Sequence, residues 1–129
     1  MALRVLIVDD HPAFRRALAA ALKLVESVEV VGEAGGGVAA AEQAETLVPD
    51  VILMDLSMPD LDGISAMRRI HERDPTMPVV ILTAHADPGV EKEARAAGAR
   101  GFLAKGIPLD RLVRELHDAA EGAASAARS

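Results

Sequence analysis

The sequence predicts an α/β fold: a doubly wound, five-stranded parallel sheet in the strand order 2-1-3-4-5, with five flanking helices. Short apolar runs alternate with segments whose apolar residues recur at helical spacing, and five such strand–helix units fit within residues 1–122. Two of the runs, Val51–Met54 and Val79–Leu82, are unbroken apolar stretches, as strands buried on both faces of a parallel sheet require. The right-handed crossover rule leaves few strand orders, of which this is the commonest at this size.

Length and composition are those of one domain with its own core. The chain has 129 residues, of which 50% are hydrophobic. We predict a domain over residues 1–122, followed over residues 123–129 by a flexible tail or a truncated linker. The 20 acidic and 14 basic residues give a net charge of −6, which disfavours direct binding to nucleic acid. Because no apolar run approaches the length of a signal peptide or a membrane span, we expect a cytoplasmic protein that binds no membrane.

The first strand and helix are marked by a carboxylate pair and a proline. The apolar run Val5–Val8 predicts a strand that ends on Asp9 and Asp10, and Pro12 favours a helix start. Apolar residues then follow at helical spacing, namely Phe14, Leu18, Leu22 and Val25. The strand therefore delivers two carboxylates to its carboxyl end, directly before the helix.

The second strand leads into a run of three glycines. Val28, Val30 and Val31 predict the strand, and an alanine-rich helix is expected from about Val38 to Leu47. Gly35–Gly37 lie between the two. Neither a GxGxxG nor a GxxxxGK pattern includes these glycines, so we predict a flexible connection rather than a phosphate-binding loop.

The other three strands each end on a polar residue. They are expected over Val51–Met54, ending on Asp55, over Val79–Leu82, ending on Thr83, and over Gly101–Ala104, ending on Lys105. The helices that follow them are expected around Ile64, Met67 and Ile70, from about Val90 to Ala97 before Gly98, and along Leu109, Leu112, Val113 and Leu116 to about Glu121.

In the predicted order, four strand ends meet around one crevice. They bring together Asp9, Asp10, Asp55, Thr83 and Lys105. Neighbouring carboxylates repel each other by roughly 4 kcal/mol per pair at about 4 Å and an effective dielectric of about 20, so a cation must balance them. Because the candidate ligands are all oxygen donors, we expect a hard cation, and Mg²⁺ is favoured because it also bridges to phosphate.

This set of residues resembles the receiver domain of two-component response regulators, a family with a flavodoxin-like fold. The resemblance rests on Asp9 with Asp10, on Asp55 followed by a Met-Pro turn and Asp-Gly, on Thr83 and on Lys105. It covers about residues 3–121. Each signal is weak alone, but five of them in this order at strand ends are highly specific.

The resemblance implies a role for each of these residues. Asp55 is the expected phosphoacceptor, which takes a phosphoryl group from the phosphohistidine of a histidine kinase. The expected Mg²⁺ ligands are Asp9, Asp10, Asp55 and the backbone carbonyl of Ser57, with Asp9 acting directly or through water. Thr83 and Lys105 are expected to bind phosphoryl oxygens, and the small Ala84 leaves room for the group.

The resemblance also implies a conformational switch. Phe102 occupies the position of the family's aromatic switch residue, which is expected to turn inward as Thr83 moves toward the phosphate; a plain core role is the alternative. The output surface is expected on the helix from Val90, the strand that ends at Lys105 and the last helix. Ser57 and His85 are the candidates for tuning dephosphorylation.

Four other polar residues have simpler explanations. Asp60 and Asp62 follow the strand that ends on Asp55, where turn and helix-cap residues are expected. His71 and His117 fall within predicted helices, and we expect both to be solvated.

One departure from the family pattern concerns the residue after Lys105. Many receivers have proline there, commonly with a cis bond, whereas this chain has Gly106. A cis non-prolyl bond costs about 2.5–4 kcal/mol, so we expect a trans bond. This feature resembles the NarL/FixJ-like subgroup, whose members usually carry a C-terminal helix-turn-helix DNA-binding domain that these 129 residues lack. Transcriptional output through such a domain and a stand-alone receiver that acts through protein contacts, including a homodimer, both stay open.

Two other classes of protein share part of this pattern. A phosphatase with an aspartate nucleophile usually has a second Asp two residues later, where this chain has Ser57. A flavodoxin has a phosphate loop rich in Ser, Thr and Gly rather than Asp9 and Asp10, and this chain has no Trp or Tyr to stack on a flavin. We therefore expect a switch and not an enzyme, with catalysis limited to its own phosphoryl transfer and autodephosphorylation. A receiver that works only as a constitutive interaction surface is disfavoured because the acidic pocket is complete.

Overall fold

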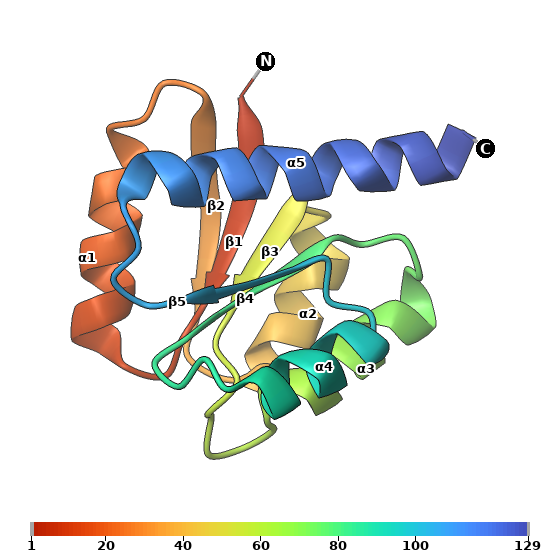
Figure 1. Cartoon of the computed structure of the whole chain (residues 1–129). Coiled ribbons are helices and arrows are strands. Elements are labelled where there is room, and N and C mark those ends of the chain that lie inside the picture. The colour runs from red at the N-terminus through yellow and green to blue at the C-terminus, as the bar shows by residue number, and fades with distance from the viewer. Residues whose placement is uncertain (1, 129) are drawn as a thin grey trace.

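Strands and helices alternate strictly along the chain (Figure 1). The computed structural model describes residues 2–128, and the side chains of residues 2–122. The elements within this part are β1 (Leu3–Val8), α1 (Pro12–Lys23), β2 (Val28–Ala34), α2 (Gly37–Leu47), β3 (Val51–Met54), α3 (Gly63–Arg73), β4 (Val79–Thr83), α4 (Pro88–Ala96), β5 (Gly101–Ala104) and α5 (Leu109–Arg128). The strands pair in parallel in the order β2-β1-β3-β4-β5, which confirms the predicted topology.

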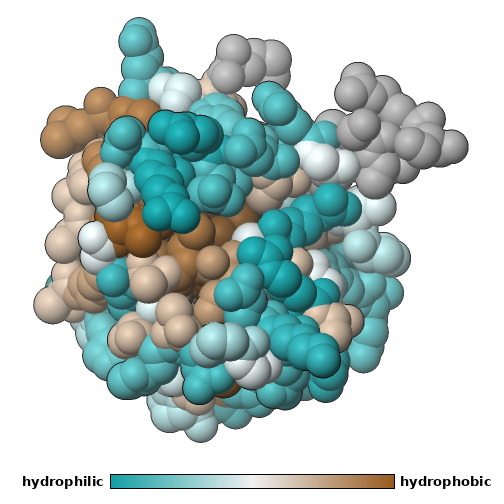
Figure 2. Space-filling view, viewed as in Figure 1, coloured by the Kyte–Doolittle hydropathy of each residue, from teal (hydrophilic) through white to brown (hydrophobic). Residues whose placement is uncertain are grey.

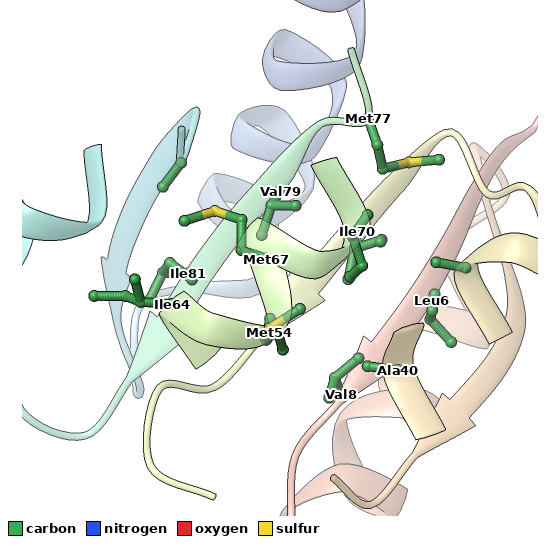
Figure 3. Packing of buried hydrophobic residues seen from close by; sticks show 14 of the residues in the cluster. Leu6, Val8, Ala40, Met54, Ile64, Met67, Ile70, Met77, Val79 and Ile81 are labelled. Carbon is green, nitrogen blue, oxygen red and sulfur yellow. The ribbon is translucent and has the colours of Figure 1, made fainter. Parts of the chain in front are cut away.

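The helices cover both faces of the sheet, with α1 and α5 on one face and α2, α3 and α4 on the other (Figure 1). Successive strand residues point to opposite faces, so each central strand supplies both cores. Ile52 and Met54 of β3 belong to the core under α2, α3 and α4, whereas Val51 and Leu53 belong to the core under α1 and α5. Figure 3 shows the first of these cores, where Met67 of α3 lies over the sheet. This two-sided burial explains the unbroken apolar runs.

The glycine run before α2 is not the flexible connection that we predicted. Gly36 and Gly37 are buried, and the Asp60 carboxylate accepts hydrogen bonds from the N–H groups of Gly37 (3.1 Å) and Val38 (3.1 Å). A Cβ atom on Gly37 would lie 2.5 Å from the backbone oxygen of Leu61. The glycines are therefore needed because the loop after β3 packs directly against the start of α2.

Several element boundaries differ from the prediction. α1 ends at Lys23, so Val25 packs against the core from the connection after the helix. β2 continues to Ala34, and α4 begins at Pro88 because Asp87 caps it by accepting from the N–H of Gly89 at 2.7 Å. α5 extends to Arg128, since its last residues are rich in alanine, the strongest helix former. The division between a domain and a tail at residue 122 stays a prediction, and the side chains after that residue lie outside the described part.

Two histidines that we expected to be solvated are partly buried and have partners. The Nε2 atom of His71 lies 2.9 Å from the backbone oxygen of Met77, and its ring fills the space beside Gly98, where a Cβ would lie 2.9 Å from it. The Nε2 atom of His117 lies 3.1 Å from the hydroxyl of Ser27.

None of the helices in the described residues combines the length and apolarity that crossing a membrane requires.

Candidate functional site

The polar strand ends meet at the carboxyl edge of the sheet. The backbone ladder continues one residue beyond the strands: the N–H of Asp9 donates to Ala34 (3.0 Å), that of Asp55 to Val8 (3.0 Å) and that of Lys105 to Thr83 (2.8 Å). Sheet hydrogen bonds thus fix the backbone from which each of these side chains projects. Asp9, Asp55 and Thr83 are no more than 3% exposed, although each carries a polar side chain.

An ammonium group joins the two buried carboxylates. The Nζ of Lys105 lies 2.7 Å from Oδ2 of Asp9 and 3.5 Å from Oδ2 of Asp55. Burial raises the pKa of the Asp55 carboxyl above its ordinary value; the Lys105 charge lowers this pKa, and the Asp9 charge raises it again. The net direction of the pKa is upward because burial, the largest influence, outweighs the lowering by the Lys105 charge. The site therefore holds an uncompensated negative charge when both are ionised.

A cluster of possible metal ligands lies beside this ion pair. Oxygen atoms of Asp9, Asp10 and Asp55 and a ring nitrogen of His11 all lie within 4.8 Å of one another. Oδ1 of Asp10 is buried and makes no hydrogen bond within the described residues, although Nδ1 of His11 lies 3.2 Å away. A buried carboxylate oxygen without a donor fits a bound cation, and the oxygen-rich donor set fits a hard one.

His11 was not among the ligands predicted from the sequence. Its backbone N–H donates to Oδ1 of Asp9 at 2.9 Å, and its Nδ1 lies 3.1 Å from the same oxygen. Its position directly after two aspartates at a strand end was the signal that could have indicated it, since a histidine there brings a nitrogen donor to the same edge.

The loop after Asp55 is closed by one glycine. The N–H of Gly63 donates to the backbone oxygen of Leu56 at 2.9 Å, and a Cβ on Gly63 would lie 2.4 Å from the backbone oxygen of Asp55. Asp62 caps α3 as predicted, because its carboxylate accepts from the N–H of Ser65 at 3.0 Å. Asp60 caps a helix too, but that helix is α2 and not the one that follows it.

The remaining predicted residues lie around this centre. Thr83 is buried, and its hydroxyl oxygen accepts from the N–H of His85 at 3.4 Å. Phe102 pairs with Ile81 in the β4–β5 register, which places it on the same face of the sheet as Thr83, within the core under α4. Ala84, His85 and Ser57 are exposed.

The loop after β5 has the predicted peptide geometry. The Lys105–Gly106 bond is trans, and Gly106 has a φ of +98°, which only glycine adopts without strain. The glycine thus provides a sharp turn between β5 and α5.

The comparisons with known proteins agree with this geometry. The family model described as the response regulator receiver domain matches residues 5–117. The chain belongs to the response regulator receiver domain family. It therefore serves as a receiver in two-component signal transduction, and the resemblance stated from the sequence is confirmed.

Individual relatives support the same family. The transcriptional regulatory protein NarL of Mycobacterium tuberculosis is 39% identical over 119 residues, which cover 92% of this chain and 55% of NarL. The solved receiver domain of that protein has a TM-score of 0.88 at 38% identity, covering 94% of this chain and 98% of that one. The response regulator domain of Thermotoga maritima CheB has a TM-score of 0.86 at 32% identity, with 94% and 98% covered. This receiver spans about half the length of the curated NarL protein.

Proposed function

We propose that Asp55 accepts a phosphoryl group from the phosphohistidine of a histidine kinase. The observation that carries this proposal is the burial of Asp55 at the carboxyl end of β3, with Oδ2 beside the Lys105 ammonium and Oδ1 held by the Leu56 N–H at 2.9 Å. Oδ2 forms the new P–O bond as the P–N bond of the phosphoimidazole breaks, and the leaving nitrogen takes up a proton. Asp55 must be ionised for this step, and a further cation would favour the ionised form against the burial that raises its pKa.

The cation that fits is Mg²⁺, held by Asp9, Asp10, Asp55 and the backbone carbonyl of Ser57. The orphaned Oδ1 of Asp10 and the oxygen-rich donor set support this assignment. When bound, Mg²⁺ supplies charge that stabilises both the ionised carboxylates and the transferring phosphoryl group. His11 lies close enough to the carboxylates to add a nitrogen ligand for ions that prefer one.

Lys105 and Thr83 bind the phosphoryl oxygens in this proposal. Lys105 already contacts both buried carboxylates, so its ammonium needs only a short movement to meet a group attached to Asp55. Thr83 holds one long hydrogen bond, from the His85 N–H, which it can exchange for a phosphoryl oxygen. Ser57 and His85, whose side chains are exposed, are the candidates for affecting the approach of water and thereby the rate of autodephosphorylation.

The switch in this proposal couples Thr83 to Phe102 and to the surface formed by α4, β5 and α5. Thr83 and Phe102 share one face of the sheet, so movement of the first changes the packing around the second. Figure 2 shows apolar surface below α5, where β5 and its connection to α5 lie in Figure 1, framed by hydrophilic residues. An apolar area bordered by polar residues is typical of a protein contact.

The partners follow from this role. The phosphodonor is a histidine kinase, the receiver acts in the cytoplasm, and it modifies only itself. NarL of M. tuberculosis and DegU of Brevibacillus brevis are named as transcriptional regulatory proteins, and this chain covers 55% and 52% of their lengths. We infer a transcriptional output through a C-terminal helix-turn-helix domain beyond these residues. A stand-alone receiver that acts through protein contacts or as a homodimer is the alternative.

Intact mass spectrometry tests the phosphoacceptor. The protein is incubated with a small phosphodonor and Mg²⁺, and the expected result is the added mass of one phosphoryl group in the parent and none in Asp55→Asn. Asp60→Asn is the matched control, because this exposed carboxylate of the same loop caps α2 and should leave the modification unchanged. Modification that persists in Asp55→Asn would refute the assignment of the phosphoacceptor, and equal modification when EDTA replaces Mg²⁺ would refute the role of the metal.

A further inference from the structure

We propose that Phe14 is a positioning residue for phosphoryl transfer, because its ring face holds the Lys105 ammonium beside the two carboxylates. The inference rests on the proposed role of Asp55. The Nζ of Lys105 lies 4.3 Å from the centroid of the Phe14 ring. At that distance the cation is attracted to the electron-rich face of the ring.

The contact completes the surroundings of the ammonium. Its charged partners are Oδ2 of Asp9 at 2.7 Å and Oδ2 of Asp55 at 3.5 Å, and the side chain of Lys105 is only 14% exposed. An ammonium carries three N–H bonds, whereas two carboxylate oxygens lie near it. The ring face gives the remaining charge a favourable neighbour where little water reaches it.

The Phe14 ring and the Lys105 ammonium come from different parts of the fold: Phe14 lies in α1, which follows β1, and Lys105 follows the edge strand β5. α1 begins at Pro12, two residues after Asp10, and Phe14 lies in its first turn. Phe14 packs against the core under α1 and α5, and it borders a narrow space, shared with Asp9 and Asp55, that holds no room for a water molecule. The ring is therefore fixed by α1, whereas Lys105 arrives from β5 at the edge of the sheet.

Phosphoryl transfer changes the contact between Lys105 and Asp55 but not the contact between Lys105 and the Phe14 ring. Phosphorylation converts Asp55 from a carboxylate into an acyl phosphate and moves the partner of Lys105 to a phosphoryl oxygen, whereas the face of Phe14 stays the same. A contact that persists through the reaction limits where Nζ can go and keeps it close to the oxygen where charge develops. Loss of the ring should therefore slow phosphoryl transfer at saturating phosphodonor and leave the affinity for Mg²⁺ unchanged.

The experiment separates the π face from simple packing. Phe14→Leu keeps an apolar side chain without a π face, and fluorinated phenylalanines incorporated at position 14 keep the ring while withdrawing electrons from its face. Leu18→Ala is the packing control, because Leu18 borders the same narrow space and lies one turn further along α1. We measure the rate of phosphorylation by a small phosphodonor at saturation, the Mg²⁺ affinity and the free energy of unfolding.

We expect Phe14→Leu to lower the rate by between about fivefold and thirtyfold, which spans the effect of losing a cation–π contact at an exposed and at a desolvated site. The rate should fall stepwise with each added fluorine and should be unaffected by Leu18→Ala. In a Lys105→Met background, fluorination should have no effect. The proposal is overturned if Phe14→Leu retains the parent rate, if fluorination leaves the rate unchanged, or if the fluorine series has the same slope in the Lys105→Met background.

A second measurement does not depend on phosphorylation. Protons on the ε-methylene of Lys105 should resonate upfield in the parent because of the ring current of Phe14, and they should return to ordinary positions in Phe14→Leu. Absence of that difference overturns the proposal. A parent that shows the ring-current shift but takes up no phosphoryl group would instead refute the role of Asp55 and, with it, the catalytic part of the inference.

Discussion

Replacing Asp55 by asparagine should make the metal-free protein more stable at neutral pH. Asp55 is 3% exposed, and a carboxylate oxygen of Asp9 lies within 4.8 Å of one of its own. At an effective dielectric of 20, that separation gives a repulsion of about 3.5 kcal/mol or more. The Lys105 ammonium at 3.5 Å gives an attraction of about 5 kcal/mol by the same relation.

The two charge interactions nearly cancel, so the cost of burying the Asp55 charge decides the sign. That cost is several kcal/mol for one ion. The raised pKa of Asp55 agrees in direction, since burial makes the ionised carboxylate less favourable in the folded state than in the unfolded chain. We expect Asp55→Asn to raise the free energy of unfolding by about 1 to 3 kcal/mol in EDTA at pH 7, measured by urea denaturation.

The pH dependence gives this prediction a second check. Because the folded pKa of Asp55 is raised, its protonated form contributes stability at pH values below the unfolded value of 3.8, and that contribution is lost as the pH rises through the folded pKa. The advantage of Asp55→Asn should therefore shrink as the pH falls. Adding Mg²⁺ should also reduce it, because the ion stabilises the parent more than the variant.

Asp60, in the same loop, provides a control for which we expect the opposite change in stability. Asp60 has a lowered pKa because it accepts from the N–H groups of Val38 and Gly37, so Asp60→Asn should destabilise the protein at pH 7. The reasoning would be refuted if Asp55→Asn proved less stable than the parent in EDTA, or if its advantage were the same at every pH.

Three further predictions concern other parts of the site. Gly63→Ala should destabilise the fold by about 3 kcal/mol or more in urea denaturation, because its Cβ would lie 2.4 Å from the backbone oxygen of Asp55. Gly35→Ala is the control and should cost less than about 1 kcal/mol, because its Cβ would meet only a flexible arginine side chain at 3.3 Å. Equal losses of stability in the two variants would contradict the argument. Asp62→Ala should lower the free energy of unfolding by about 1 kcal/mol at pH 7, because it removes the α3 cap. The pKa of Asp62 is lowered in the folded state, so this difference in stability should disappear as the pH falls through that pKa. A difference that stayed constant with pH would exclude a charge effect. His11→Ala should weaken Mn²⁺ binding more than Mg²⁺ binding in calorimetry, since imidazole favours transition ions, and equal weakening would argue against ligation.

Much of the fold could be predicted because its signals are local or periodic. The unbroken run at Val51–Met54 corresponds to a strand buried on both faces, and polar residues after four strands met at one edge as the topology requires. The strand order then placed Asp9 and Asp55 together without any knowledge of distances.

The features that sequence did not predict depend on contacts between distant segments. The sequence predicts a flexible connection at the glycine run because Asp60, whose carboxylate binds the N–H groups of Gly37 and Val38, lies more than 20 residues further along the chain. His71 was expected to be solvated because its partner oxygen on Met77 lies outside its helix. Phe14 was assigned to the helix stripe, and only the three-dimensional structure brings the Lys105 ammonium over its ring.

The Asp60 cap holds the loop after β3 in place against the start of α2. Together with the closing bond between Gly63 and Leu56, it anchors the segment that follows Asp55 to α2 and leaves this side little freedom to respond. The segment after Thr83 is exposed as far as Asp87, and its hydrogen bonds are local: the N–H of His85 donates to the Thr83 hydroxyl at 3.4 Å and that of Asp87 to the backbone oxygen of His85 at 3.0 Å. When Asp55 is phosphorylated, the segment that follows it should consequently keep its position. The conformational change should instead occur in the β4–α4 connection.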